Sequence, residues 1–344
     1  MKLLIITQKV DVRDDVLGFF HWWISEFAKQ CDSVTVICLQ KGECHLPPNV
    51  HILSLGKEEG LSRSKYLSRF YRFVWQERDN YDTVFVHMNP VYIALAGPLW
   101  HIWGKKVALW YIHPKADKYL KAAHVFAQRI FTASDRSFPF ASPKIMVVGH
   151  GIDTERFQPM TGVVKEKNSI VYVGRISPVK QLDILADAAR SLDVKGVAFT
   201  LHIIGGQDVQ HADYYARFKQ DLAELERKGR VVYHGPIPNV ELPQWYNKYE
   251  VLVNTTPTGS FDKTVLEAMA CGTLATVSNK SFAEFLPPEF LVPEGNSKRL
   301  ADVLTSVLSL SDEEKKQYAK RLRNTVVEHH SLSALVEKIT HSLS

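Results

Sequence analysis

The sequence has no long apolar run, and this absence sets a first limit on function. No stretch of about eighteen or more apolar residues occurs in its 344 residues, so we expect no segment to span a membrane. The N-terminus reads MKLLIIT and turns polar within a few residues. This stretch is too short for the core of a signal peptide and indicates a first strand, so we expect a cytoplasmic protein.

Cysteine is scarce and has no metal-binding spacing. None of the four cysteines lies in a C-x-x-C pattern; they are Cys31, Cys38, Cys44 and Cys271. Reduced thiols of a cytosolic protein are the simplest interpretation. A D-x-D-like motif is also missing, so we expect neither a metal nor another cofactor.

Strong charge of one sign is missing as well. The formal net charge of +5 favours anionic partners only modestly, meaning phosphates or an acidic lipid surface. No basic tail, zinc-ligand spacing or aromatic-glycine RNA-binding pattern is found, so we expect no nucleic-acid partner.

Length and composition indicate a globular protein of two domains. The hydrophobic content is 45% and the charged content 23%, as in soluble globular proteins. Because 344 residues exceed one ordinary core, we predict two domains. We place them at residues 1–155 and 156–326, with the linker near residues 155–168. A C-terminal helix within residues 327–344 is expected to pack back on the first domain.

Short β-branched runs alternate with longer helical stretches, which predicts an α/β fold with parallel sheets covered on both faces. The predicted strands are residues 2–7, 33–39, 82–88, 106–112, 144–149, 169–175, 199–206, 230–235, 250–255 and 273–278. The predicted helices are residues 16–30, 62–78, 182–192, 212–229, 241–249, 263–270, 312–330 and 331–344. Each half is therefore expected to be a Rossmann-like unit, with ligands at the carboxyl ends of its strands and one cleft between the units.

Two cations are predicted to flank a helix start in the second half. The stretch SIVYVGRISPVKQLDILADAA ends a strand at Gly174, continues with Arg175, turns at Pro178 and begins a helix near Val179 and Lys180. Free backbone amides, the helix dipole and two positive charges suit a diphosphate that gains negative charge as it leaves. The alternative is a solvated Arg and Lys pair, which is common at helix starts.

A second helix start lies in TGSFDKTVLEAMACG, residues 258–272. The amides of Lys263, Thr264 and Val265 could hold another phosphate. Glu267 stands in an apolar run and needs a partner, because an unpaired buried carboxylate is costly. That partner is either the ribose of the same ligand or a buried Arg or Lys. Either Ser260 or Asp262 is the expected N-cap.

Four segments, taken together and in order, resemble the GT4 type of GT-B glycosyltransferases. They are residues 149–159, 172–189, 231–256 and 264–272. The resemblance implies a retaining, metal-independent transfer of a sugar from a UDP- or GDP-sugar to an acceptor bound by the first domain. By position it implies that Arg175 and Lys180 hold the diphosphate, Glu267 binds the ribose, and the backbone at Pro236 and Ile237 lies against the base.

One departure from the resembled pattern concerns the donor sugar. Gly259 stands where the family has a Glu, eight positions before Glu267. The residues expected beside the sugar are Gly259, Ser260 and Phe261. Asp262 is the nearest carboxylate, and it either takes part of the missing catalytic role or caps the helix.

In the first half, His113 follows a strand end where the family has a His near the transferred sugar, which implies a catalytic role. Its alternative role is to cap the next helix. His87 either lines the cleft or packs locally. The family's glycine-rich loop is replaced by TQKVDVRDDVLGFF, so Asp15 and Gly18 are the acceptor-side candidates. His150 stands where Asn is usual, and its function stays open.

Residues 62–78 mix basic and aromatic side chains. Such a helix suits docking on an anionic bilayer, peripherally on its inner face. Alternatively, the aromatic residues are core and the cations form a solvated face.

The predicted function is a glycosyltransferase that acts on a glycan or lipid-linked acceptor in cell-envelope polysaccharide or glycolipid assembly. Two alternatives stay open. One is a nucleotide-sugar epimerase of the same fold, for which no extra acid and base carboxylates are found. The other is a non-catalytic nucleotide-sugar-binding protein, suggested by Gly259.

Overall fold

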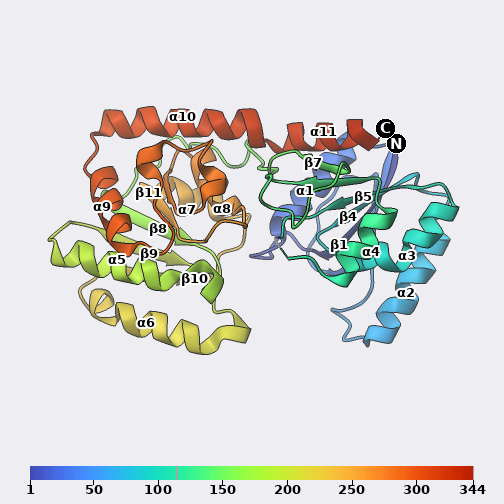
Figure 1. The fold of residues 1–344 in the computed structure, drawn as a ribbon, viewed down its shortest axis with the longest axis horizontal. Helices are drawn as coiled ribbons and strands as arrows, with labels where there is room; N and C mark the ends of the chain where they lie inside the picture. Colours follow the sequence, from blue (N-terminus) through green and yellow to red (C-terminus); the bar gives the residue numbers. More distant parts are fainter. Residues whose placement is uncertain (114, 344) are drawn as a thin grey trace. The chain divides into compact units, whose positions relative to one another are not determined.

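The chain folds into two α/β units, each with its own parallel sheet (Figure 1). The computed structural model describes residues 1–113 and 115–343. Unit 1 comprises residues 1–151, 238–240 and 332–344, whereas unit 2 comprises residues 152–237 and 241–331. The α/β class with two Rossmann-like units is thereby confirmed.

Unit 1 is built on a seven-stranded parallel sheet in the order β3-β2-β1-β4-β5-β6-β7. The strands are β1 (Lys2–Val10), β2 (Ser33–Lys41), β3 (Val50–Ser54), β4 (Thr83–His87), β5 (Lys106–Trp110), β6 (Arg129–Thr132) and β7 (Ile145–Val147). The helices are α1 (Gly18–Gln30), α2 (Arg63–Gln76), α3 (Pro90–Ile102), α4 (Lys118–Phe126) and α11 (Leu332–Leu343).

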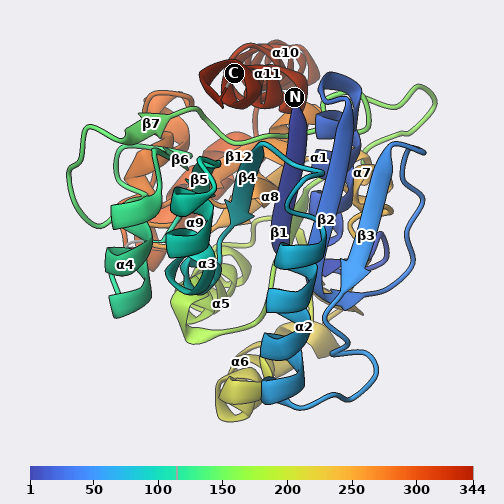
Figure 2. The ribbon, with the colours of Figure 1, turned by 90° about the vertical axis from the view of Figure 1, so that its right-hand side faces the viewer.

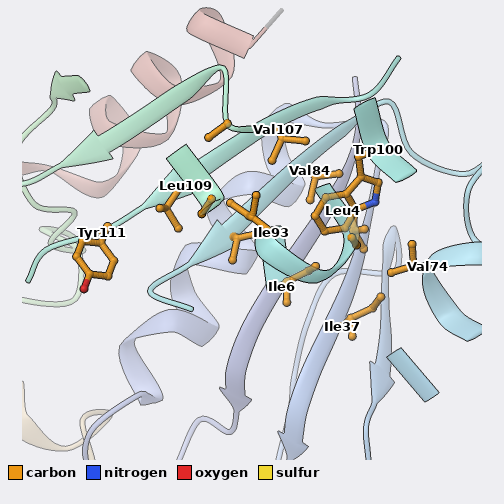
Figure 3. Close-up of a cluster of buried hydrophobic side chains, with 14 of the residues drawn as sticks. Leu4, Ile6, Ile37, Val74, Val84, Ile93, Trp100, Val107, Leu109 and Tyr111 are labelled. Carbon is orange, nitrogen blue, oxygen red and sulfur yellow. The ribbon is translucent and has the colours of Figure 1, made fainter. Parts of the chain in front are cut away.

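Alternating side chains of this sheet build a core on each face. Leu4 and Ile6 of β1 belong to the cluster that Val74 of α2 and Trp100 of α3 complete (Figure 3). In Figure 2, α2 and α3 lie over this face of the strands. On the other face, Phe27 of α1 packs against Phe85 of β4 with ring centroids 5.1 Å apart. Helix α11 packs against α1.

Unit 2 carries a five-stranded parallel sheet in the order β10-β9-β8-β11-β12. The strands are β8 (Ser169–Val173), β9 (Thr200–Ile204), β10 (Val231–Gly235), β11 (Val251–Asn254) and β12 (Leu274–Val277). The helices are α5 (Leu182–Val194), α6 (Ala212–Arg227), α7 (Leu242–Lys248), α8 (Lys263–Ala270), α9 (Ser297–Leu308) and α10 (Asp312–His330). Short 3-10 turns cover Pro178–Lys180, Val209–His211, Lys280–Phe282 and Pro288–Phe290.

All ten predicted strands are present, with shifted ends, and α8 and α10 have the predicted bounds. The predictions omitted β3, β6, α3, α4 and α9. Helix α11 was predicted to pack on the first domain, and its residues fall in unit 1. The first segment of unit 1 ends at Gly151, four residues before the predicted boundary at 155. Helix α10 runs beyond the predicted end of the second domain at 326.

Within residues 1–113 and 115–343, no helix combines the length and the hydropathy needed to cross a membrane.

Candidate donor-binding site

The strand order of unit 2 singles out one place for a ligand. The chain leaves β8 toward β9 on one side and returns to β11 on the other. The gap between the carboxyl ends of β8 and β11 is therefore the topological switch point, where open parallel sheets bind ligands. Two loops meet there, residues 174–181 after β8 and residues 255–262 after β11, and we call them the β8 loop and the β11 loop.

A buried ion pair joins these two loops. Lys180 Nζ donates to Asp262 Oδ2 across 2.7 Å, and the side chains are only 16% and 13% exposed. The same oxygen accepts hydrogen bonds from Asn254 Nδ2 at 2.8 Å and Thr256 Oγ1 at 2.6 Å. Thr255 Oγ1 donates to the Lys180 carbonyl oxygen at 2.6 Å. The switch point is thus held by side chains that come from both loops.

Asp262 stays ionised in this setting. Burial alone would raise the pKa of its carboxyl, but the Lys180 ammonium and the donated hydrogen bonds hold that pKa well below its ordinary value. Asp262 does occupy the N-cap position of α8, yet its side chain makes no capping hydrogen bond. The prediction that its side chain caps the helix is therefore wrong: the carboxylate binds Lys180 instead. Its catalytic role stays a prediction.

Arg175 is the cation of the β8 loop that faces solvent. Its side chain is 57% exposed, and its guanidinium lies 4.0 Å from Asp208. Behind it, Gly205 approaches the Gly174 carbonyl so closely that a Cβ on Gly205 would lie 1.9 Å from that oxygen. Gly205 therefore has to be glycine for β8 and β9 to end in this arrangement.

The α-helix after the β8 loop begins at the start of the predicted range 182–192 and not near Val179 and Lys180. Pro178–Lys180 form a 3-10 turn, Gln181 has a left-handed backbone with φ of 47°, and α5 starts at Leu182. The Leu182 amide donates to Tyr214 Oη at 2.7 Å. Lys180 therefore precedes the α-helix instead of lying in its first turn.

The amides at the start of α8 are only partly available. Val265 N donates to the Asp262 carbonyl oxygen at 3.3 Å, and Val265 is fully buried. This contact is long, and phosphate binding by the Val265 amide stays a prediction. Within the described part of the chain, no protein acceptor is recorded for the Thr264 amide, so Thr264 stays a candidate.

Glu267 is 3% exposed and has protein partners of its own. Tyr246 Oη donates to its Oε2 at 3.0 Å. The carboxylate also interacts electrostatically with Lys263 and Arg156. Burial lowers the pKa of Lys263 to about 7, with Glu267 and Asp262 opposing the shift. Buried cations therefore lie close enough to act as the partner of Glu267. Ribose binding by Glu267 stays a prediction.

The three residues expected beside the donor sugar, Gly259, Ser260 and Phe261, differ in their burial. Phe261 is 2% exposed and stacks on Phe282 with centroids 4.4 Å apart. The ring belongs to an aromatic core, so only the backbone of Phe261 remains for the predicted contact with the sugar, which stays a prediction. Ser260 Oγ donates to Asp262 Oδ1 at 2.9 Å. Gly259 has φ of 109°, a conformation that favours glycine.

Two residues that sequence reasoning missed fix this stretch from outside it. Asn279 Nδ2 donates to the Ser260 carbonyl oxygen and, at 3.3 Å, to that of Pro257. Glu294 accepts hydrogen bonds from the Thr258 amide, at 2.9 Å, and from the Thr258 hydroxyl. No local spacing signals these contacts, because Glu294 lies 36 residues further along the chain.

The predicted base-binding residues follow the edge strand β10. The Gly235 carbonyl accepts a hydrogen bond from Gly205 N at 2.8 Å, which joins the ends of β9 and β10. Pro236 is exposed and Ile237 is half-buried. Both lie at the carboxyl edge of the sheet, and contact with a base stays a prediction.

In unit 1, the acceptor-side candidates lie in the loop after β1. Asp15 is exposed, and Gly18 is buried at the start of α1, where a Cβ would lie 3.0 Å from the Val12 carbonyl oxygen. The sequence reasoning overlooked Asp14. Its carboxylate pairs with Lys9 at 2.5 Å and also accepts the Leu17 amide.

The three histidines noted in unit 1 have different environments. His113 is exposed, and its Nδ1 accepts the Lys115 amide at 3.1 Å. It does not cap α4, because Asp117 does so by accepting the Leu120 amide at 2.7 Å, and its role at the sugar stays a prediction. His87 packs locally and stacks on Phe20 with centroids 4.0 Å apart. His150, 1% exposed, lies between Trp23 and Trp110.

A cluster of metal ligands is not found in the described part of the chain. No group of three or more His, Cys, Asp or Glu side chains there could hold a metal ion. The four cysteines are unpaired. Metal independence of the reaction stays a prediction.

The unit with this switch point matches a known family. The family model described as glycosyl transferases group 1 covers residues 167–310, which include both loops. These residues, less than half of the chain, are similar to the group 1 glycosyltransferases. The fold of the chain is GT-B. The structure of Anabaena Alr3699/HepE in complex with UDP and glucose has a TM-score of 0.78 at 18% identity. That comparison covers 100% of this chain and 99% of the other, and it shows the fold alone.

Curated relatives of this protein match over a limited segment. The D-inositol 3-phosphate glycosyltransferase of Frankia alni is 29% identical over 142 residues, 38% of this chain and 35% of the relative. The lipopolysaccharide core biosynthesis mannosyltransferase LpsB of Rhizobium meliloti is 26% identical over 152 residues, 42% of this chain and 43% of the relative. The matched segments thus span less than half of the length of these relatives.

Proposed function

We propose that this protein is a group 1 glycosyltransferase that binds a UDP- or GDP-sugar at the switch point of unit 2 and transfers its sugar to an acceptor. The observation that carries the proposal is the ion pair between Lys180 and Asp262, which fixes both loops at this point, next to the solvent-facing Arg175. The complexes of Anabaena Alr3699/HepE with UDP and with UDP-glucose support a nucleotide-sugar donor.

In the proposed reaction, the bond between the anomeric carbon and the diphosphate breaks, and a bond to an acceptor hydroxyl oxygen forms. The proton of that hydroxyl passes to the leaving diphosphate. Arg175 would neutralise the negative charge that develops on the leaving diphosphate, and the buried Lys180 would contribute further positive charge. Because Asp262 already neutralises much of the Lys180 charge, Arg175 has the larger role. The transfer is proposed to retain the anomeric configuration and to need no metal.

The proposed acceptor is a glycan or lipid-linked molecule of cell-envelope assembly, bound by unit 1. The relative LpsB, named for lipopolysaccharide core biosynthesis, supports this class. Asp15, Gly18 and His113 remain the candidates for the acceptor side.

A surface of unit 1 suits an acceptor held in a membrane, at the inner face of an anionic bilayer. Leu67, Tyr71 and Trp75 follow one another at helical spacing on α2 and are 42%, 36% and 56% exposed. Trp75 packs edge-on against Trp103, and the neighbouring Ile102 is 76% exposed. Basic side chains of the same helix flank this stripe, namely Arg63, Lys65 and Arg72. Exposed aromatic rings beside cations favour an anionic bilayer surface.

The proposed activity is tested by incubating the protein with a panel of UDP- and GDP-sugars and lipid-linked or glycan acceptors. NMR of the product reports the linkage, and a parallel reaction contains excess chelator. Transfer with retention that persists in chelator is expected. Interconversion of donor sugars without an acceptor would support the epimerase alternative instead. Donor binding without transfer or hydrolysis would support a non-catalytic binding protein.

Membrane docking is tested with vesicles that contain about one-third phosphatidylglycerol. The parent protein is expected to sediment with them at low salt and less at high salt, because added ions screen surface charges. Leu67→Ser with Trp75→Ser should reduce sedimentation several-fold. Val125→Ser is the control, since Val125 is 68% exposed on α4, outside the stripe. Equal sedimentation of all three proteins, or none at low salt, would refute the docking surface.

A further inference from the structure

Unit 2 contains a cavity at a distance from the donor loops. Its volume is about 660 Å³, within the range of small-molecule sites. Its lining includes Glu250 and Leu274, which lie at the starts of β11 and β12. The β8 and β11 loops follow the opposite ends of the strands. The cavity is therefore at the amino edge of the sheet and is separate from the proposed donor site.

One wall of this cavity is apolar and open to solvent. It comes from the segment that precedes β8, where Met160, Val163 and Val164 are 37%, 39% and 88% exposed. Cys271 and Leu274 add buried apolar surface. Exposed apolar side chains grouped around a cavity are typical of a binding site. The lining contains no aromatic side chain, so it offers an alkyl chain a contact surface but offers a nucleotide base no ring to stack on.

The other wall is strongly basic. Six cations line the cavity against two carboxylates, Glu250 and Asp312; the cations are Lys165, Lys167, Lys315, Lys316, Lys320 and Arg323. The excess is large for a protein whose whole formal charge is +5. A concentrated positive field at one cavity favours an anionic occupant.

Three of these cations already have hydrogen-bond or ion-pair partners within the protein. Lys315 pairs with both oxygens of Glu250 at 3.1 and 3.0 Å. Lys165 donates to the Tyr249 carbonyl at 2.8 Å, and Arg323 donates to the carbonyls of Phe157, Ala270 and Thr154.

The remaining three cations, Lys167, Lys316 and Lys320, are exposed. No ion pair is recorded for them within the described residues. They are therefore available at the cavity to an anion that comes from solution.

We propose that this cavity binds an amphiphilic anion, namely an alkyl chain that ends in a phosphate. The chain would lie along Met160, Val163 and Val164, and the phosphate would contact Lys316 and Lys320 from α10. Lys316 and Lys320 are four residues apart on one helix, so their side chains share a face. The site does not depend on the proposed glycosyl transfer.

The test is a calorimetric titration of the full chain with decyl phosphate below its micelle concentration, at low salt. Saturable binding at one site is expected, at least tenfold tighter than binding of 1-decanol or of inorganic phosphate, because each probe lacks one half of the ligand. Equal affinity for inorganic phosphate would reject the apolar half of the site, and equal affinity for 1-decanol would reject the basic half.

Variants locate the binding. Lys316→Ala with Lys320→Ala should weaken decyl phosphate binding about tenfold, which corresponds to about 1.4 kcal/mol. Val164→Asp, at an 88% exposed position, should weaken it as well. Arg321→Ala with Lys298→Ala removes the same charge at exposed positions outside the cavity and should leave affinity unchanged. The site is refuted if decyl phosphate fails to saturate, or if the cavity variants bind like this control.

Discussion

At the scale of single residues, Asp262 has a different role from the one that its position suggests. The sequence places it near Gly259, where the resembled family has a carboxylate, and at the start of a helix. The structure directs its side chain to Lys180, which is 82 residues away in the chain. A buried ion pair stabilises a protein little more than apolar residues would, but removal of one partner leaves the other charge buried and unpaired. Asp262 therefore holds Lys180 and the two loops in place.

Asp262→Asn should lower the free energy of unfolding of the protein by about 3 kcal/mol, because Lys180 then keeps its buried charge without a counterion. Urea denaturation at neutral pH measures the loss. The double variant Asp262→Asn with Lys180→Met should lose less unfolding free energy, because it no longer contains the unpaired Lys180 charge. A loss below about 1 kcal/mol in the single variant, or additive losses in the double variant, would contradict a buried ion pair.

The same pair has a pH dependence of known sign. The pKa of Asp262 is lower in the folded protein than in the unfolded chain, where it is about 4. Its contribution is therefore full above about pH 4 and is lost as the pH falls below that value. The stability difference between the parent and Asp262→Asn should narrow in acid, and a difference that widens in acid would exclude this account.

At the scale of elements, two neighbouring strands carry a chain of titratable groups that sequence reasoning did not find. His202 of β9 and His234 of β10 lie with Nδ1 and Nε2 3.0 Å apart, and His202 Nε2 is 3.1 Å from Glu166. Tyr249 Oη and Lys248 also face this group. Burial lowers the pKa of both histidines; Glu166 opposes the shift in each.

These two histidines should make the folded protein less stable in mild acid than at neutral pH. The unfolded chain binds protons at its histidines near pH 6.5, whereas the folded chain resists them, so stability falls as the pH drops below about 6.5. We expect His202→Gln with His234→Gln to lose less stability between pH 7.5 and 5.5 than the parent does, in thermal melts at both values. An equal or larger loss in the variant would refute buried, neutral histidines.

There are physical reasons why the sequence pattern does not predict some of the elements. Helix α3, PVYIALAGPLWHI, is apolar on most sides and contains Pro98, so it lacks the one-sided pattern by which a surface helix is predicted. By contrast, α8 and α10 lie between clear start and stop signals. Ser311 and Glu314 form a full capping box at the start of α10.

At the scale of the whole molecule, the sequence predicted the α/β class, the parallel strands and the loops that reach the switch point of unit 2. It could not predict which groups in those loops pair with each other. The contacts of Asp262 with Lys180 and of Thr258 with Glu294 join segments far apart in the chain. The burial of the Phe261 side chain also depends on a residue outside its loop, Phe282, on which its ring stacks. Long-range partners of this kind leave no local spacing pattern.

The central claim is that a nucleotide-sugar donor binds at the switch point, with Arg175 as its solvent-facing cation. Calorimetric titration of UDP and GDP, with their sugars, into the parent and two variants tests it most directly. Arg175→Ala should weaken binding at least tenfold, whereas Arg190→Ala is the matched control, a half-exposed arginine further along α5 that is paired with Asp187. The account predicts binding that Arg190→Ala preserves and Arg175→Ala weakens. Equal affinity of all three proteins, or no nucleotide binding by the parent, would contradict it.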